Sequence, residues 1–345
     1  MNFLACDLGG TKILLGIFKT DINDDSPKLI FKKKYLSSEW DSFELILEDF
    51  LENQCKNIAH PYSACFAIAG PLSNKNAKII NLSWDISGNA LQNKFNFKNC
   101  ELINDFAVQI YGIPYLKKNQ YSTIQNGSST KGVNEDLHAI VGAGTGLGIA
   151  RGIISGRKVK VLASEGGHVE YSPKSKLEWE LKIWLKNHLK VERISCERII
   201  SGPGLSRIAE WILSKPDAQN HPLQKYLGEI KNSDALRKEL PEKICTLSNN
   251  GDQLMIEVER IWLGAYASLL GDVALEVLCF GGLWISGGTA PKHFKNFKSD
   301  LFMKQFFDKG RLKDILKTIP MKVILDEEFG LFSAACRAKM LLKTS

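Results

Sequence analysis

One local pattern occurs twice in the chain and constrains the fold more than any other feature. A short apolar run leads into a polar, glycine-rich turn and a second apolar run follows, first at residues 3–18 and again at residues 139–154. Apolar runs interrupted in this way are typical of strand–turn–strand hairpins. Because the two copies lie about half a chain apart in a sequence of 345 residues, they predict two related α/β domains.

The segments between and after the hairpins fit this plan. Further apolar runs predict strands at residues 29–36, 64–69, 101–103 and 283–286. Apolar residues at helical spacing predict helices at residues 41–54, 177–188, 204–213, 234–248, 253–278 and 329–342. Residues 126–135, rich in Gly, Ser, Thr and Asn, are expected to form the crossing between the halves.

Neither glycine turn matches a common nucleotide-binding fingerprint. The chain has no Gly-Lys dipeptide, which excludes a P-loop. Leu147 stands where a Gly-x-Gly-x-x-Gly motif starting at Gly142 would have its third glycine, so a nicotinamide dehydrogenase is disfavoured.

The backbone amides of such turns can still hold a phosphate group, because glycine lets the chain approach an anion closely. Asp7, at the start of the first turn, could hold Mg²⁺ beside that phosphate, directly or through water. The alternative is that both turns are ordinary tight hairpins, which also need glycine. Two turns of one design, containing Asp and Thr, favour phosphate binding.

Several polar residues lie where a ligand could meet them. Asn104 and Asp105 follow an apolar strand, at the edge of an α/β sheet where ligands bind, although Asp105 could instead cap a helix at residues 106–111. Glu165 and His168 flank two glycines and could face a polyol, or His168 could bond only to its neighbours. That segment lacks the second His of a zinc-protease motif. Glu197 precedes another glycine-rich turn, or pairs with a neighbouring cation on a helix surface.

The composition of the chain indicates the compartment in which the protein works and the classes of partner that are not expected. The formal charge of +7 is modest and its lysines are scattered, so neither a nucleic acid nor a membrane is an expected partner. Eight cysteines without a Cys-x-x-Cys spacing indicate reduced thiols, and the N-terminus lacks the apolar run of a signal peptide. Residues 271–290 are the best candidate for a membrane span, but they carry two acids and five glycines. This composition indicates a helix followed by a buried strand instead. A cytoplasmic protein is expected.

Taken in order, these motifs resemble the bacterial glucokinase family, a branch of the sugar-kinase/actin/Hsp70 ATPase fold. The matching segments are Asp7-Leu-Gly-Gly-Thr11, Leu102-Ile-Asn-Asp-Phe106, Gly142-Ala-Gly-Thr-Gly-Leu-Gly148, Glu165-Gly-Gly-His168 and Glu197-Arg-Ile-Ile-Ser-Gly-Pro-Gly204, with shorter matches at residues 67–71, 81–84, 285–288 and 330–335. Together they run from about residue 3 to about residue 340. The resemblance implies a two-domain actin-like ATPase fold (ribonuclease H-like) with a cleft between the domains.

The resemblance also implies the reaction, which is the ATP-dependent phosphorylation of D-glucose to glucose 6-phosphate. Asp105 would be the general base that takes the proton from the sugar 6-hydroxyl. The residues implied in sugar binding are Asn81, Asn104, Asp105, Glu165, His168 and Glu197. Those implied in binding ATP with Mg²⁺ are Asp7, Leu8, Gly9, Gly10, Thr11, Gly144, Thr145, Gly287 and Gly288, with Asp7 as the Mg²⁺ residue.

The family further implies a homodimer of chains with two domains each. The small domain would comprise residues 1–111 and 329–345, and the large domain residues 112–328. Ile80 has no hydroxyl where the family pattern leads us to expect one, so the sugar contacts of that loop stay open. The related repressor/kinase family has a cysteine-rich zinc motif after its Glu-x-Gly-His segment, but here no cysteine follows before Cys196.

Three other functions stay open beside glucose phosphorylation by ATP. The chain could be a related hexokinase for fructose or mannose, or one that uses polyphosphate as its phosphoryl donor. It could also be a catalytically silent sugar sensor on the same fold. A sensor would be expected to lack Asp7 or Asp105, and both are present.

Overall fold

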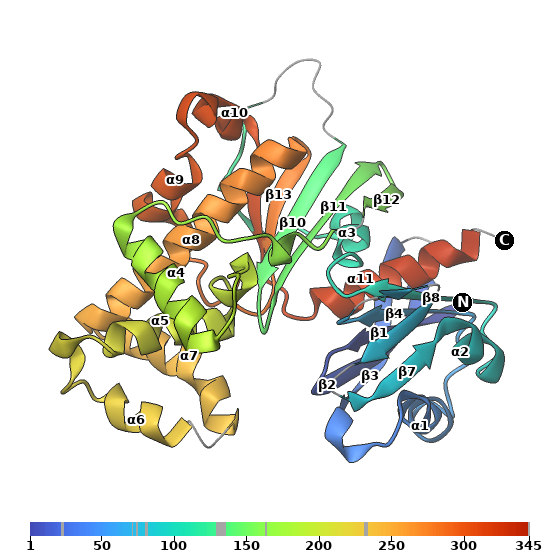
Figure 1. Cartoon of the computed structure of the whole chain (residues 1–345). Helices are drawn as coiled ribbons and strands as arrows, with labels where there is room; N and C mark the ends of the chain where they lie inside the picture. The colour runs from blue at the N-terminus through green and yellow to red at the C-terminus, as the bar shows by residue number, and fades with distance from the viewer. Residues whose placement is uncertain are drawn as a thin grey trace. The chain divides into compact units, whose positions relative to one another are not determined.

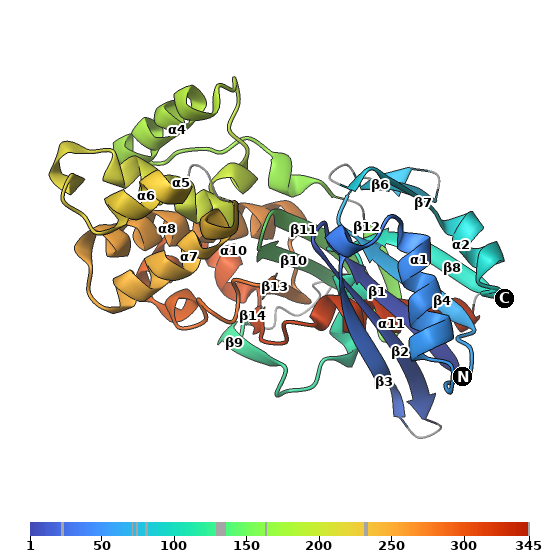
Figure 2. The same ribbon diagram turned by 90° about the horizontal axis from the view of Figure 1, so that it is seen from below.

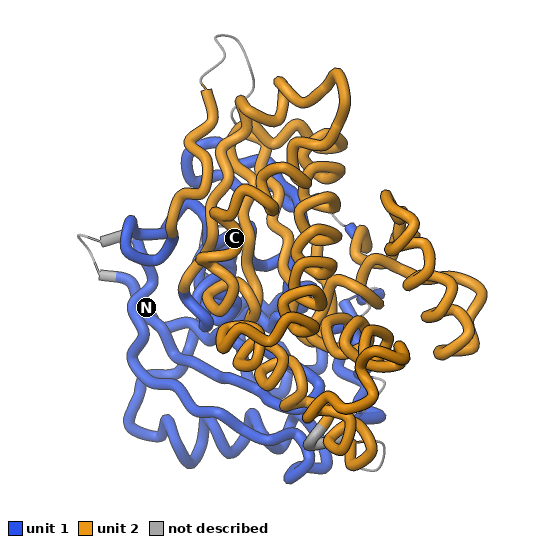
Figure 3. Tube along the Cα trace, turned by 90° about the vertical axis from the view of Figure 1, so that its left-hand side faces the viewer, with its two compact units in different colours: residues 1–121, 150–164, 326–345 blue, residues 122–149, 165–325 orange. Residues whose placement is uncertain are grey.

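The computed structural model describes residues 1–21, 24–70, 72–73, 75–79, 82–128, 136–162, 164–230 and 234–343. The contacts within the chain divide it into two compact units, coloured in Figure 3. Unit 1 comprises residues 1–121, 150–164 and 326–345, and unit 2 comprises residues 122–149 and 165–325.

These units differ from the expected division at residues 112–121, 150–164 and 326–328, which group with unit 1. Packing explains the second segment, because Gly152 lies directly against Ile110. A Cβ added at Gly152 would be 2.7 Å from Cγ2 of Ile110.

Unit 1 contains a sheet with the strand order β3-β2-β1-β4-β8 (Figure 1). Its strands are β1 (Asn2–Leu8), β2 (Lys12–Asp21), β3 (Asp24–Leu36), β4 (Ser63–Ile68) and β8 (Asn99–Asn104). β2 is antiparallel to β1 and to β3, whereas β1, β4 and β8 are parallel. The carboxyl ends of the three parallel strands therefore lie at one edge of this sheet.

Both faces of this sheet are buried. Alternate residues of a strand point to opposite faces. Phe3 and Ala5 accordingly share a core cluster with α11 (Phe329–Met340), while Leu4 shares another with α1 (Phe43–Glu48). The two helices lie on opposite faces of the sheet in Figures 1 and 2. This packing fixes β1, and with it the turn that follows β1.

Smaller elements complete unit 1. They are a three-stranded sheet of β5 (Leu72–Ser73), β6 (Asn76–Ile79) and β7 (Trp84–Ser87), and the helices α2 (Gly88–Lys94) and α3 (Gln109–Gly112). Ser87 begins α2, because its hydroxyl accepts a hydrogen bond from the Ala90 N–H at 3.4 Å.

A second sheet has the strand order β12-β11-β10-β13-β14-β9. Its strands are β9 (Tyr121–Gln125), β10 (Leu137–Ala143), β11 (Leu147–Ser155), β12 (Lys158–Leu162), β13 (Gly282–Ser286) and β14 (Met321–Ile324). β10, β13 and β14 are parallel, so their carboxyl ends also share an edge.

β12 and most of β11 belong to unit 1, and helices accompany the other strands in unit 2. These helices are α4 (Lys176–Leu189), α5 (Gly202–Leu213), α6 (Leu223–Ile230), α7 (Asp234–Asn249), α8 (Gln253–Val277), α9 (Asp300–Phe306) and α10 (Lys313–Thr318). α8 packs against β10, and α5 and α7 pack on α8 (Figure 1). The fully buried side chains of Trp262 and Tyr266 make α8 the centre of this core.

Two predicted helices differ from those in the structure. The predicted helix at residues 41–54 is α only over α1, and continues as the π-helical segment η2 (Asp49–Gln54). The predicted helix at residues 106–111 is wrong, because residues 106–108 form a turn and α3 begins only at Gln109. The other predicted strands and helices are present, with small shifts at their ends.

All eight cysteines are free thiols, and six of them are buried. Among the helices of the described residues, none has the length and apolarity needed to cross a bilayer. The predicted crossing at residues 126–135 falls largely on residues 129–135, outside the described residues.

Candidate active site

The first glycine turn joins β1 to β2 in unit 1. The Gly9 N–H donates to the carbonyl of Lys12 at 3.0 Å, which closes the turn. Ser37, which is buried, holds the turn from behind: its hydroxyl donates to the Gly10 carbonyl at 2.9 Å and its N–H to the Thr11 carbonyl at 3.3 Å. Gly9 and Gly10 are partly exposed and Thr11 is exposed, so the turn can meet a ligand.

Asp7 and Leu8 precede this turn but differ in what they can offer. The Leu8 side chain is fully buried in the core, which leaves only its backbone for a ligand. The Asp7 carboxylate lies at the start of α11, where a Cβ on Gly330 would be 3.1 Å from Oδ2. Burial raises the pKa of Asp7 above its ordinary value, while a helix N-terminus favours the ionised form.

Asn104 and Asp105 lie at the end of β8, at the same sheet edge as Asp7. The register pairs Asp7 with Ala67 on β4, and Ala67 with Ile103 on β8. Asp7 and the end of β8 are thus two strand spacings apart, about 10 Å. The sheet therefore brings these three predicted residues to one edge.

The side chains of Asn104 and Asp105 are both held by the turn that follows them. Oδ1 of Asn104 accepts from the N–H groups of Phe106 and Ala107, each at 3.0 Å. Oδ1 of Asp105 accepts from the Phe106 N–H at 2.9 Å. Asn104 thus makes the capping contacts that the sequence suggested for Asp105, and the Asp105 carboxylate has a fixed position at the sheet edge. Asn81, the remaining sugar residue predicted in unit 1, lies outside the described residues.

The second glycine turn joins β10 to β11 in unit 2. The Gly144 N–H donates to the Gly146 carbonyl at 2.8 Å, and the Gly202 N–H, at the start of α5, donates to the Gly144 carbonyl at 2.8 Å. A Cβ added at Gly144 would meet nothing within 4 Å, so this part of the turn faces open space. The neighbouring Thr145 is exposed.

Gly287 and Gly288 lie beside this turn, because β10 and β13 are parallel and Gly142 pairs with Ser286. Gly287 has a φ of +87°, and a Cβ there would be 2.7 Å from the Ala143 carbonyl oxygen. The hydroxyl of Thr289 donates to the same oxygen at 2.7 Å. The structure thus brings Gly144, Gly287 and Gly288 to one sheet edge, as an adenosine and phosphate site would need.

Glu197 and His168 meet at the start of β11. Oε2 of Glu197 accepts from the Leu147 N–H at 3.1 Å. Gly167 packs against the same residue so closely that a Cβ would be 2.0 Å from the Leu147 carbonyl oxygen. The backbone of Leu147 therefore brings together the short 3₁₀ turns η5 (Gly166–His168) and η6 (Cys196–Arg198).

Glu165 and His168 are more exposed than Glu197. Their nearest polar side-chain atoms, Oε2 of Glu165 and Nε2 of His168, are 3.9 Å apart, and the side chains are 74% and 55% exposed. The His168 carbonyl accepts from Nη1 of Arg193 at 2.7 Å. His168 is thus held through its backbone, and its ring can turn toward a ligand.

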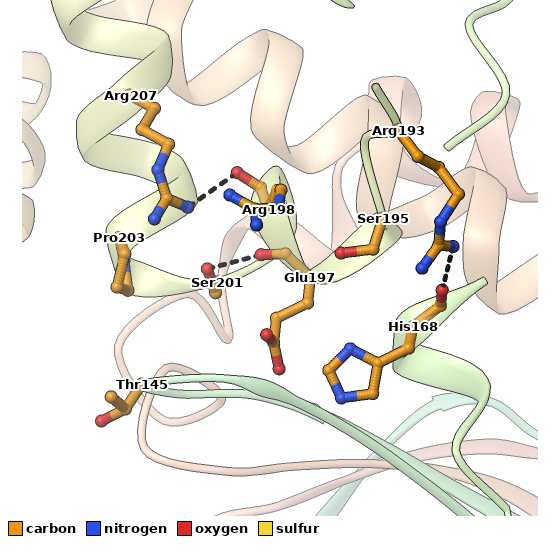
Figure 4. Close-up of a pocket in the computed structure, with 9 residues that line it drawn as sticks. All are labelled: Thr145, His168, Arg193, Ser195, Glu197, Arg198, Ser201, Pro203 and Arg207. Atoms are coloured by element: carbon orange, nitrogen blue, oxygen red, sulfur yellow. Dashed lines mark hydrogen bonds between the residues drawn. The ribbon is translucent and has the colours of Figure 1, made fainter. Parts of the chain in front are cut away.

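A cavity of about 350 Å³ opens beside these residues in unit 2 (Figure 4). Its lining comprises Thr145, His168, Arg193, Ser195, Glu197, Arg198, Ser201, Pro203 and Arg207. The Glu197 carboxylate points into the space between Thr145 and the ring of His168 (Figure 4). The cavity therefore joins a carboxylate and an imidazole, which can hydrogen-bond hydroxyls, to Thr145 of the second glycine turn.

Three arginines also line this cavity, of which the sequence indicated only Arg198, as a possible partner of Glu197. Nη1 of Arg207 donates to the Arg198 carbonyl at 3.0 Å, and burial together with the charge of Arg198 lowers the pKa of the Arg207 guanidinium. Arg198 directly follows Glu197, and this adjacency is the local signal that indicated it. Arg193 and Arg207 carry no such signal, because the fold alone brings them to the cavity.

Comparisons with known proteins agree on one family. The family model described as Glucokinase matches residues 4–341. A glucokinase of Synechocystis sp. is 35% identical over 354 residues, which cover 98% of each chain. The crystal structure of a glucokinase from an Antarctic psychrotroph is 26% identical, covers 98% of each chain and has a TM-score of 0.78.

A ROK family glucokinase from Streptomyces griseus, solved with glucose and AMPPNP, shares the fold more distantly. It is 18% identical, its TM-score is 0.62, and the match covers 99% of this chain and all of that chain. The predicted two-domain actin-like ATPase fold is thus confirmed by structures with this architecture.

Proposed function

This chain belongs to the glucokinase family, and we propose that it transfers the γ-phosphoryl group of ATP to the 6-hydroxyl of D-glucose. The observation that carries this proposal is the position of Glu197. Its carboxylate accepts the N–H of Leu147, the residue that ends the second glycine turn, and points into a polar cavity with His168. A side chain that can hydrogen-bond sugar hydroxyls is therefore itself hydrogen-bonded to a turn whose backbone amides can bind phosphate.

In this reaction Asp105 is the general base. Its Oδ1 is fixed by the Phe106 N–H at 2.9 Å, so the carboxylate can accept the 6-hydroxyl proton without reorganising. Asn104, which is held in the same way, hydrogen-bonds a neighbouring hydroxyl. Phosphoryl transfer needs little more from the protein than a base, correct positioning and stabilisation of the developing charge.

The other sugar hydroxyls are read by Glu165, His168, Glu197 and Asn81. A carboxylate accepts hydrogen bonds from two hydroxyls, and an imidazole can donate one or accept one. When a hydroxyl is missing or inverted, such groups lose a partner in a partly buried site, which costs about 1–3 kcal/mol for each group. This cost would make the pocket selective for the hydroxyl pattern of glucose.

ATP is held by the glycine turns. The amides of Gly9, Gly10 and Thr11 and those of Gly144 and Thr145 donate to phosphate oxygens, and Gly287 and Gly288 adjoin the adenosine. Amide groups aimed at the transferred phosphoryl group stabilise the charge that develops there.

Asp7 is the residue that would hold Mg²⁺. The fit rests on its burial, which raises the pKa of the carboxyl, and on its position between the first glycine turn and the start of α11. A divalent cation beside it would supply the positive charge that this partly buried carboxylate lacks. Bound Mg²⁺ would neutralise the charge of the β- and γ-phosphates.

The family resemblance extends the proposal to location and assembly. We expect a cytoplasmic enzyme, in keeping with the free state of all eight cysteines. We also expect a homodimer, which light scattering of the purified protein would test.

The test is a coupled assay of ADP release with Mg-ATP and glucose, mannose, fructose, glucosamine or no sugar. We expect turnover with glucose and none without sugar. Preference for another hexose, or formation of glucose 6-phosphate from polyphosphate but not from ATP in a parallel assay, would show a related kinase. Glucose binding by calorimetry without turnover on any sugar or donor would contradict the proposal and favour a sugar sensor.

A further inference from the structure

Three side chains with metal-binding atoms meet in the interior of unit 2. They are Cys245 on α7, Glu259 on α8 and His293 in the loop that follows β13. One ligand atom of each lies within 4.8 Å of the other two. Glu259 is 8% exposed and His293 is 4% exposed, and none of the three lines the cavity of Figure 4.

One contact within the cluster is too long for a hydrogen bond, and another is a hydrogen bond to sulfur. Oε1 of Glu259 is 3.7 Å from Nδ1 of His293, which is too long for an N–H···O bond. Sγ of Cys245 is 3.8 Å from Nε2 of the same ring. Two donors on one tetrahedral zinc lie roughly 3.3–3.8 Å apart, given bond lengths near 2.0–2.3 Å. Because these two contacts use different ring nitrogens, binding one ion requires the three ligand atoms, which lie within 4.8 Å of one another, to move closer by about 1 Å.

Neighbouring side chains hold two of these ligands in place. The hydroxyl of Ser248 donates to Oε2 of Glu259 at 2.6 Å, which leaves Oε1 directed at the ring of His293. That ring packs on Trp262, with centroids 4.8 Å apart, and lies 6.5 Å from the ring of Phe297. Outer groups of this kind orient the ligands of known metal sites.

The charges around these three side chains also favour a bound cation. Among the described residues, no Lys or Arg forms an ion pair with Glu259, and the neighbouring Lys292 is exposed. A buried carboxylate is costly unless it is paired or coordinates a metal. One divalent cation would balance one carboxylate and one thiolate.

We propose that Cys245, Glu259 and His293 bind one zinc ion, which ties α7 and α8 to the loop after β13. A thiolate, an imidazole and a carboxylate are a ligand set that zinc accepts, with water in the fourth position. On binding, the Cys245 thiol gives its proton to solvent and a zinc–sulfur bond forms. The site stabilises unit 2 and takes no part in phosphoryl transfer.

Cobalt(II) titration of the chelator-treated full-length protein tests this proposal, because cobalt replaces zinc and is coloured. We expect one equivalent to bind with the intense visible bands of tetrahedral cobalt and a thiolate-to-cobalt band in the near ultraviolet. Zinc should displace the cobalt and raise the melting temperature. Absence of stoichiometric binding, or a cobalt spectrum without the thiolate band, would overturn the proposal.

Variants decide which thiol is the ligand. Cys245→Ala and His293→Gln should each weaken cobalt binding more than 10-fold, since even outer-shell partners of metal ligands cost about 10–100-fold. Cys55→Ala is the matched control, because Cys55 is a free thiol in unit 1, and it should bind cobalt like the unaltered protein. Circular dichroism identifies any variant that fails to fold. Unchanged binding by folded Cys245→Ala would overturn the proposal, even if His293→Gln does not fold.

Discussion

The two glycine turns have the same plan in the sequence, but each unit holds its turn in a different way. In unit 1, the side chain and N–H of Ser37 hold the turn from behind, and the base candidate Asp105 follows a different strand, β8. In unit 2, the Glu197 carboxylate accepts the N–H that ends the turn. The candidate phosphate and sugar contacts are therefore separate in unit 1 and joined in unit 2.

This difference has a kinetic consequence. In unit 1, a substitution at the proposed base Asp105 should leave the first glycine turn intact, because that turn is held by Ser37 and by the bond from the Gly9 N–H to the Lys12 carbonyl. In unit 2, a substitution at Glu197 removes a hydrogen bond of the turn as well as the proposed contact to sugar. Effects on glucose and on ATP should thus be independent in unit 1 and coupled in unit 2.

The largest expected effect is that of Asp105→Asn. The amide can still accept the Phe106 N–H through Oδ1, but it cannot take the hydroxyl proton. Loss of a general base costs about 10²–10⁴ in rate, so kcat should fall by that factor while the KM for ATP stays the same. Steady-state kinetics with varied glucose and varied ATP measure both. Full activity of this variant on every sugar would exclude Asp105 as the base.

Next in size is the effect of replacing Glu197, which tests the coupling in unit 2. Glu197→Gln removes the charge but keeps an acceptor for the Leu147 N–H. A hydrogen bond to a charged group contributes about 1.5–3 kcal/mol, so the KM for glucose should rise roughly 10–100-fold. Glu197→Ala also leaves the Leu147 N–H without its acceptor, and should raise the KM for ATP as well.

The KM for ATP of these two variants decides whether the sugar and phosphate contacts of unit 2 are coupled. If Glu197→Ala and Glu197→Gln both leave the KM for ATP unchanged, the hydrogen bond between Leu147 and Glu197 does not affect ATP binding. Equal glucose binding by both variants and the unaltered protein, measured by calorimetry, would remove Glu197 from the sugar site.

The sequence predicted the parts of the site that are local in the chain. Both turns were found because glycine-rich runs between apolar strands need only a few consecutive residues. The long helices α4 and α8 were found because their apolar periodicity extends over several turns. Glu197 was found as a candidate, but its bond to Leu147 spans 50 residues and no local pattern encodes it.

The two helices that were predicted incorrectly show how other contacts override periodicity. At residues 106–111, the Asn104 side chain takes the N–H groups of Phe106 and Ala107, which holds a turn where a helix was expected. In the helix after α1, the Asp49 carboxylate accepts from the Tyr35 hydroxyl at 2.7 Å and from Lys33 at 3.1 Å. The α-helix gives way to a π-helical segment at that residue.

Two glycines of unit 2 should respond differently to the same substitution. Gly287→Ala places a Cβ 2.7 Å from the Ala143 carbonyl in a backbone region that L residues rarely adopt, and should lower the free energy of unfolding by about 1–3 kcal/mol. Gly144→Ala meets nothing within 4 Å and should leave the melting temperature unchanged. It should nevertheless raise the KM for ATP, because the methyl group stands where phosphate would approach.

Calorimetry of both proteins, with the ATP kinetics of each, separates these outcomes. A Gly144→Ala protein with normal stability and a normal KM for ATP would mean that this turn does not contact the phosphates. A stable Gly287→Ala protein would show that the loop after β13 moves easily away from Ala143.

The smallest expected effects come from the two hydroxyls that hold the turns. Ser37→Ala removes the bond to the Gly10 carbonyl, and Thr289→Val removes the bond to the Ala143 carbonyl while keeping the side-chain volume. A neutral hydrogen bond contributes about 0.5–1.5 kcal/mol, so each variant should raise the KM for ATP roughly 2–10-fold. Because Glu197 joins the turn of unit 2 to the sugar residues, only Thr289→Val should also raise the KM for glucose. The same change in glucose KM for both variants would contradict the separation of functions in unit 1.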